Sequence, residues 1–197
     1  TRRRASAVAG GTQARGAGDA LLLGRYRLGR LLGVGSVGRV YLAEDLLESR
    51  PVALKLLSLA GAQSALSRTL YARFCREASL LAALRHPQLM AVHAFFPTAG
   101  VMALEFMPGG ACSELSRPLP LVRMRRLLLD VIEALLCMHA AGVLHRDVKP
   151  HNVFVSATGG AKLGDFGVAS LRELGVTQTE GLVGTLSYMA PEQIRGT

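Results

Sequence analysis

A glycine-rich segment between two strand-like runs constrains the fold of this chain more than any other feature. Residues 33–40 read G-x-G-x-x-G-x-V. Glycines at this spacing let backbone N–H groups approach phosphate oxygens, because no Cβ stands in the way. The flanking residues 26–31 and 40–43 have the apolar and β-branched content of strands. The segment therefore predicts a hairpin whose turn is either a phosphate-binding loop or an ordinary turn.

The residues after the glycines exclude two common nucleotide-binding folds. In a dinucleotide-binding fold the glycine loop opens a helix, whereas the run that starts at Val40 is β-like. A Walker A loop needs Lys and then Ser or Thr after its last glycine. Here Arg39 and Val40 follow Gly38, so neither fold fits.

The rest of the chain predicts a mixture of strands and helices, an α+β fold. Apolar residues recur at spacings of three and four over residues 67–84, and His86-Pro87 ends this pattern. The Pro-Gly-Gly stretch at 108–110 indicates a boundary between two lobes. In chain order, we expect strands at 26–31, 40–43 and 52–57, a helix at 67–84, strands at 91–96 and 101–106, a helix at 121–141 and a strand at 153–155.

Composition argues for a globular protein of a reducing compartment. Half of the residues are apolar, and the three cysteines are far apart and odd in number, which argues against a disulfide framework or a zinc knuckle. Charged residues interrupt the longest apolar stretch, and the first residues lack the apolar core of a signal peptide. We therefore expect a soluble, cytoplasmic chain.

The net charge of +9 raises the question of a nucleic-acid partner. Residues 1–24 are rich in Gly, Ala and Arg, and we expect them to form a flexible basic tail. Aromatic residues make up only 5% of the chain, and no Lys/Arg block is interleaved with them. The charge therefore favours solubility and phosphate affinity, and no specific nucleic acid is expected.

One lysine lies within an apolar strand. Lys55 ends the run at 52–55, where an ammonium is costly to bury unless it meets an anion. Glu77, on the expected helix at 67–84, could pair with it and leave it able to reach a phosphate. Alternatively, Lys55 reaches solvent at a strand edge and Glu77 pairs with Arg73.

Residues 145–152 and 163–167 carry the polar groups that phosphoryl transfer needs. A carboxylate must position the attacking hydroxyl, a cation must lie near the phosphoryl group, and oxygen ligands must hold magnesium. Asp147, Lys149 and Asn152 are of these types, and Asp165 adds a carboxylate in a glycine-flanked turn. These segments predict a phosphoryl-transfer site.

Five motifs occur in the order that characterises protein kinases. They are G-x-G-x-x-G-x-V at 33–40, V-A-x-K at 52–55, H-R-D-x-K-x-x-N at 145–152, D-F-G at 165–167 and A-P-E at 190–192. On these residues, the chain from 26 to 197 resembles the eukaryotic-like Ser/Thr protein kinases of bacteria. The resemblance implies a protein-kinase-like two-lobed α+β fold, with a β-rich N-terminal lobe at 25–107 and an incomplete, mainly α C-terminal lobe at 108–197.

The resemblance also implies where ATP binds. Lys55, held by Glu77, would contact the α- and β-phosphates, Leu104 resembles the gatekeeper, and residues 105–107 resemble the hinge. The implied ATP-binding set is Leu32, Gly33, Val34, Gly35, Ser36, Val37, Gly38, Val40, Ala53, Lys55, Glu77, Leu104, Glu105, Met107 and Phe154.

The polar loop residues receive catalytic roles from the same resemblance. Asp147 would be the catalytic base, and Lys149 would neutralise the γ-phosphate. Asn152 and Asp165 would hold Mg²⁺, with Mn²⁺ as an alternative ion. Lys149, together with Thr185 ahead of the A-P-E motif, resembles the Ser/Thr branch, in which Thr185 helps to align the catalytic loop.

Two threonines after the D-F-G motif are candidates for regulation. Thr177 and Thr179 stand where related kinases carry autophosphorylation sites, and Arg146 resembles the arginine that receives such a phosphate. The alternative is that both are merely polar loop residues.

The chain departs from the family pattern in two places. Ala111 stands where many relatives have an acidic ribose ligand, so Ser113 or Glu114 would have to substitute. The sequence stops five residues after Glu192, so we expect a truncated catalytic domain that exposes apolar surface on the helix at 121–141.

The resemblance implies a serine/threonine protein kinase that transfers the ATP γ-phosphoryl group to protein hydroxyls and autophosphorylates its activation loop. The alternatives are an inert fragment and a nucleotide-binding pseudokinase or scaffold. Trans-autophosphorylation would require a transient homodimer. Membrane association, giving a place at the cytoplasmic face, would need segments outside this sequence.

Overall fold

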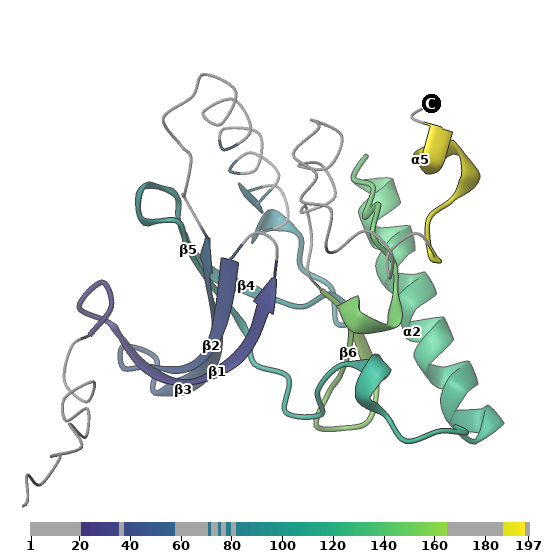
Figure 1. The fold of residues 1–197 in the computed structure, drawn as a ribbon, viewed down its shortest axis with the longest axis horizontal. Coiled ribbons are helices and arrows are strands. Elements are labelled where there is room, and N and C mark those ends of the chain that lie inside the picture. Colours follow the sequence, from purple (N-terminus) through teal and green to yellow (C-terminus); the bar gives the residue numbers. More distant parts are fainter. Residues whose placement is uncertain are drawn as a thin grey trace, which may run out of the picture.

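The computed structural model describes residues 21–35, 38–57, 71, 75, 78–79, 82–164 and 187–195. These residues form a five-stranded sheet followed by a part built around one long helix and a short hairpin (Figure 1). The strands and α-helices are β1 Tyr26–Gly35, β2 Gly38–Asp45, β3 Arg50–Leu57, β4 Val92–Phe96, β5 Val101–Glu105, α2 Leu121–Ala140, β6 Val153–Val155, β7 Ala161–Leu163 and α5 Pro191–Arg195. The short 3-10 helices are η1 Pro97–Ala99, η2 Cys112–Glu114 and η3 Pro150–Asn152.

The sheet contains the glycine-rich hairpin that the sequence predicts. Its strand order is β1-β2-β3-β5-β4, and all neighbouring pairs are antiparallel. In the hairpin of β1 and β2, Gly35 stands opposite Gly38 and Gly33 opposite Val40. A Cβ on Gly38 would lie 2.0 Å from the carbonyl oxygen of Leu56 on β3. The close approach of two strands therefore requires glycine at this position.

The strand ends differ from the sequence expectation: β1 ends at Gly35 rather than at residue 31, and β2 spans Gly38–Asp45 rather than 40–43, because the two strands stay paired up to the glycine turn. β3 begins at Arg50 rather than at residue 52, because Arg50 and Pro51 continue the pairing with the end of β2. β4 begins at Val92 rather than at residue 91, and β5 ends at Glu105 rather than at 106. Residues 21–24, assigned to the tail from the sequence, include a turn in which Tyr26 donates its N–H to the Leu22 oxygen at 3.0 Å.

The helix predicted at 67–84 is described only in part. Residues 71, 75, 78–79 and 82–83 are helical, and the chain leaves the helix at residue 84, ahead of His86-Pro87. The remaining residues of this segment, with Glu77 among them, lie outside the described residues.

The sheet packs apolar side chains on both of its faces. Successive residues of a strand point to opposite sides of the sheet. Strand β3 contributes to an apolar cluster on each side, so its sequence is a nearly continuous apolar run. One cluster contains Tyr26, Ala43, Val52, Leu54, Val101 and Ala103. The other contains Ala53, Ala78, Met90, Val92, Met102, Leu104 and Met107.

Helix α2 buries one face and exposes the other. Leu127, Ala134 and Met138 are buried, and they belong to the cluster that includes residues of β6 and β7. The other side carries the exposed apolar residues Leu121, Val122, Leu128, Leu129, Ile132 and Leu136. The apolar surface that the sequence predicts on this helix is therefore observed. Among the described residues, no helix is long and apolar enough to cross a membrane.

Candidate active site

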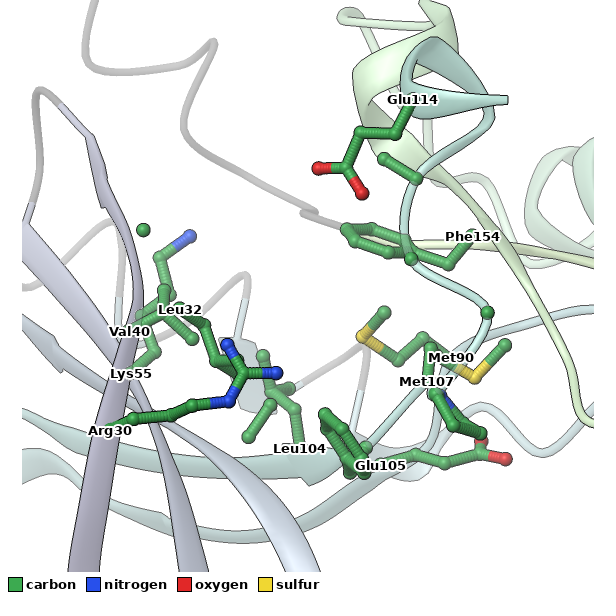
Figure 2. A pocket seen from close by; sticks show the side chains of 17 residues that line it. Arg30, Leu32, Val40, Lys55, Met90, Leu104, Glu105, Met107, Glu114 and Phe154 are labelled. Atoms are coloured by element: carbon green, nitrogen blue, oxygen red, sulfur yellow. The ribbon is translucent and has the colours of Figure 1, made fainter. Parts of the chain in front are cut away.

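A pocket of about 450 Å³ lies beside the sheet, and residues of the segment after β5 and of β6 complete its lining (Figure 2). A volume of this size suits a small organic ligand. Its apolar lining includes Leu32, Val40, Ala53, Met90, Leu104, Met107 and Phe154. Because these side chains come from both the hairpin and β6, a flat aromatic group would be buried between the two parts of the fold.

Two glycines fix the segment that leads out of the sheet. The Gly110 oxygen accepts the N–H of Val155 at 2.9 Å, and Ala111 forms a β-bridge with Phe154. A Cβ on Gly109 would lie 2.6 Å from the Val155 oxygen, and Gly110 has a φ of +68°. Glycine is therefore required at both positions. The Pro-Gly-Gly stretch acts as a fixed connection between the sheet and the helical part.

Four charged residues line the pocket, and Glu105 of β5 is one of them. Lys55 projects from β3, Arg30 comes from β1, and Glu114 comes from η2 on the other side (Figure 2). Lys55 is only 8% exposed and lines the pocket, so an anion bound there would help to offset the cost of burying its ammonium group. Ala111 lines the pocket without a polar side chain, whereas Ser113 does not belong to the lining. Of the two expected substitutes for a ribose ligand, Glu114 is the one at the pocket.

The side chain of Asp147 is held by two residues of its own loop. Lys149 Nζ lies 2.8 Å from its Oδ2 atom. The Asn152 amide donates to the same Oδ2 at 2.9 Å and to the Asp147 backbone oxygen at 2.8 Å. The side chains of Asp147 and Lys149 are 14% and 15% exposed. Asp147 thus presents an oriented carboxylate, flanked by a cation, that still reaches solvent.

Buried His145 connects this loop to the end of β7. The Asp147 N–H donates to its Nδ1 at 3.3 Å, and its Nε2 lies 3.0 Å from the Gly164 oxygen. Because a carbonyl oxygen only accepts, Nε2 carries the proton. Gly164 in turn donates its N–H to the backbone oxygen of Asn152 at 2.9 Å. These bonds hold the residue before Asp165 against the loop that carries Asp147.

Glu105 has a structural partner that the sequence does not predict. Lys162 of β7 lies 2.8 Å from Glu105 Oε1, and the Ala91 N–H donates to Glu105 Oε2 at 3.2 Å. The carboxylate therefore joins β5 to the hairpin of the helical part. The resemblance implies that the backbone of the hinge residues, Glu105 included, bonds the adenine edge, and this role stays a prediction.

The pocket brings together most of the predicted ATP-binding residues that the structure describes. These are Leu32, Gly33, Val40, Ala53, Lys55, Leu104, Glu105, Met107 and Phe154. Val34 and Gly38 belong to the hairpin but not to the pocket lining, and Val34 is exposed. Six site candidates outside the described residues are Ser36, Val37, Asp165, Thr177, Thr179 and Thr185, besides Glu77.

Sequence reasoning missed Arg30 and Met90 in the pocket lining. Arg30 stands two residues before Leu32 on β1, so the alternation of strand side chains could have placed both on one face. Met90 lies in an irregular segment between the helix and β4, where no periodicity points to the pocket.

A model of the protein kinase domain matches residues 26–197 of the chain. The chain belongs to the protein kinase family. This assignment confirms the two-lobed fold, of which the described residues form the β-rich lobe and part of the helical lobe. Kinase domains in general use ATP and a divalent metal.

The curated relatives of this kinase domain include mycobacterial Ser/Thr protein kinases. It is 38% identical over 183 residues to the serine/threonine-protein kinase PknB of Mycobacterium leprae, covering 87% of this chain and 29% of that protein. It is 39% identical over 184 residues to PknB of Mycobacterium tuberculosis, with the same two shares. PknD of M. tuberculosis is 40% identical over 179 residues, covering 88% of this chain and 26% of that protein. The matched region is thus under a third of each relative.

Proposed function

We propose that this chain carries the catalytic site of a protein kinase that transfers the γ-phosphoryl group of ATP to Ser or Thr hydroxyls of proteins. The arrangement around Asp147 supports this proposal best. Its carboxylate is oriented by Asn152 and paired with Lys149 at 2.8 Å. A pseudokinase that only binds nucleotide would have no need for a carboxylate and a cation in this arrangement.

The pocket supplies the nucleotide site in this proposal. Leu32, Val40 and Ala53 would cover one face of the adenine ring, and Phe154 would lie on the other side. Lys55 would meet the phosphates, because it is the buried cation of the pocket. Glu114 would accept hydrogen bonds from the ribose hydroxyls, because Ala111 has no polar side chain to do so.

The catalytic loop supplies the acid–base chemistry. Both side-chain contacts of Asp147 go to Oδ2, so Oδ1 would accept the proton of the attacking hydroxyl. Lys149 would offset the negative charge of the transferred phosphoryl group.

The residues present fit a divalent metal. The amide nitrogen of Asn152 makes both hydrogen bonds to Asp147, which leaves its carbonyl oxygen as a hard donor of the kind that Mg²⁺ prefers. Asp165 follows Gly164, whose N–H is bonded to the Asn152 backbone. We propose that Asn152 and Asp165 hold Mg²⁺, or Mn²⁺ in its place. When bound, the metal neutralises phosphate charge.

Regulation and setting belong to the same proposal. Thr177 and Thr179 would accept phosphate from a second copy in a transient homodimer, with Arg146 as the receiving cation and Thr185 aligning the loop. Its substrates would be proteins carrying Ser or Thr, with no specific nucleic acid partner. The kinase would act in the cytoplasm. If other segments of the protein carried a membrane anchor, it would act at the cytoplasmic face of the membrane.

Mass spectrometry of the intact chain after incubation with ATP and Mg²⁺ tests the proposal. We expect added phosphate mass in the wild type and none in Asp147→Asn, with digestion placing the phosphate on Thr177 or Thr179. Equal phosphate mass in both would refute the role of Asp147. Binding of ADP without phosphate transfer would favour the pseudokinase.

A further inference from the structure

A second cavity, of about 350 Å³, shares no lining residue with the nucleotide pocket. It lies between the segment after the partly described helix and the hairpin of β6 and β7. Its lining residues are Leu84, Arg85, His86, Pro87, Leu89, Ala91 and Lys162. The phosphoryl-transfer chemistry proposed above uses none of them.

The cavity combines an apolar surface with basic groups. Leu84, Pro87, Leu89 and Ala91 supply the apolar part, and Leu89 is buried. The other three described lining residues are all basic, and none of the lining residues that the structure describes is acidic. This combination suits a ligand that has an aliphatic group next to a negative charge.

The basic groups keep hydrogen-bond donors for such a ligand. Arg85 is exposed and donates one N–H to the Val92 oxygen at 3.3 Å, whereas a guanidinium has five N–H donors. His86 Nδ1 accepts the N–H of Gln88 at 3.4 Å, so its Nε2 carries a proton and can donate. Arg85 and Lys162 together carry two positive charges, and the Glu105 carboxylate beside Lys162 balances one of them.

We propose that this cavity binds a carboxylate attached to a branched aliphatic group. The aliphatic part would cover Leu84, Leu89 and Ala91, and the carboxylate would bond to Arg85. A free small carboxylate and a peptide ending in leucine present the same chemistry. Because Lys162 also bonds Glu105 and Glu105 bonds Ala91, binding would change the surroundings of the last residue of β5.

A titration of the ¹⁵N-labelled chain followed by NMR tests the site directly, without nucleotide. N-acetyl-leucine should shift the amide signals of Arg85, Ala91 and Glu105, and N-acetylleucinamide should bind about tenfold or more weakly, because it lacks the charge. Tighter binding of a tetrapeptide with a free C-terminal leucine would identify a peptide end as the source. Equal binding of the tetrapeptide and N-acetyl-leucine would identify the free carboxylate.

Variants and a simple anion complete the test. Arg85→Gln should weaken N-acetyl-leucine about tenfold, whereas Arg27→Gln, which alters an exposed arginine on β1, should not change its affinity. Equal shifts from the acid and the amide, the same shifts from inorganic phosphate, or no weakening in Arg85→Gln would each overturn the proposal. Because the spectrum of each variant reports its folding, a loss of binding through unfolding would be recognised.

Discussion

The Asn152 side chain donates hydrogen bonds to both the backbone and the carboxylate of Asp147, at 2.8 and 2.9 Å. Asn152 is 3% exposed, so water does not readily replace it as a donor. One buried amide thus orients the proposed catalytic base and directs its own carbonyl oxygen to other partners. The strength of this arrangement can be measured.

Asn152→Ala should lower the rate of phosphoryl transfer by about a hundredfold, because the Asp147 carboxylate loses its orienting donor and the proposed metal site loses a ligand. The affinity for ADP without metal should remain unchanged, since Asn152 does not line the pocket. Single-turnover kinetics and calorimetry measure the two quantities. His151→Ala, at the exposed neighbouring position of η3, serves as the control and should keep its rate. A similar loss in both variants would contradict the positioning role.

Glu114→Gln should weaken ADP binding about tenfold, because a charged acceptor for the ribose hydroxyls is removed. The wild type should prefer ADP over 2′,3′-dideoxy-ADP, and this preference should shrink in the variant. Ser113→Ala should leave the preference intact, since Ser113 does not line the pocket. Calorimetric titration of both nucleotides decides the matter, and an unchanged preference in Glu114→Gln would exclude the ribose contact.

The ion pair of Arg25 and Asp45 should make stability depend on acid pH. Arg25 donates two hydrogen bonds of 2.7 Å to the buried Asp45 carboxylate, and these bonds hold the pKa of Asp45 below its usual range. The unfolded chain therefore binds a proton at higher pH than the folded chain. The stabilisation is complete above the unfolded pKa of about 4 and is lost as the pH falls through the lower folded value.

Urea unfolding at several pH values measures this dependence. Asp45→Asn should be less stable at neutral pH, and its free energy of unfolding should fall less on acidification. Glu44→Gln removes a neighbouring carboxylate whose pair with Arg27 is about half exposed, and it should change stability by less than about 1 kcal/mol. Parallel acid profiles for the wild type and Asp45→Asn would refute the link.

The two faces of α2 should respond differently to truncation. Met138 is 1% exposed, and Met138→Ala should cost about 2–5 kcal/mol because it opens a cavity beside β6 and β7. Leu128 is 56% exposed, and Leu128→Ala should cost less than about 0.5 kcal/mol. Thermal unfolding of both variants provides the comparison. Equal losses would mean that the exposed face is covered in solution.

Local pattern was enough to predict most of the elements that form the proposed nucleotide pocket. The hairpin of β1 and β2 follows from the residues around the glycines, and Lys55 is buried as its apolar strand predicts. The H-R-D-x-K-x-x-N motif places Asp147, Lys149 and Asn152 within six residues of chain. Short-range spacing of this kind determines contacts, because the intervening backbone has little freedom.

Contacts between distant parts of the chain required the tertiary structure. Lys162 bonds to Glu105 across 57 positions of sequence. Neither residue lies in a sequence pattern that predicts the other as its partner. Glu114 rather than Ser113 reaches the pocket because the Pro-Gly-Gly segment docks on β6 and turns η2 toward it.

By itself, the sequence determined the family, the place of most strands and of helix α2, and the polar residues of the proposed catalytic loop, since all of these depend on local spacing. Only the tertiary structure decided which side chains share a pocket and which face of α2 is exposed. Those outcomes depend on packing between elements far apart in the chain. Many side chains there have similar chemistry, so the geometry of the fold alone decides which of them come into contact.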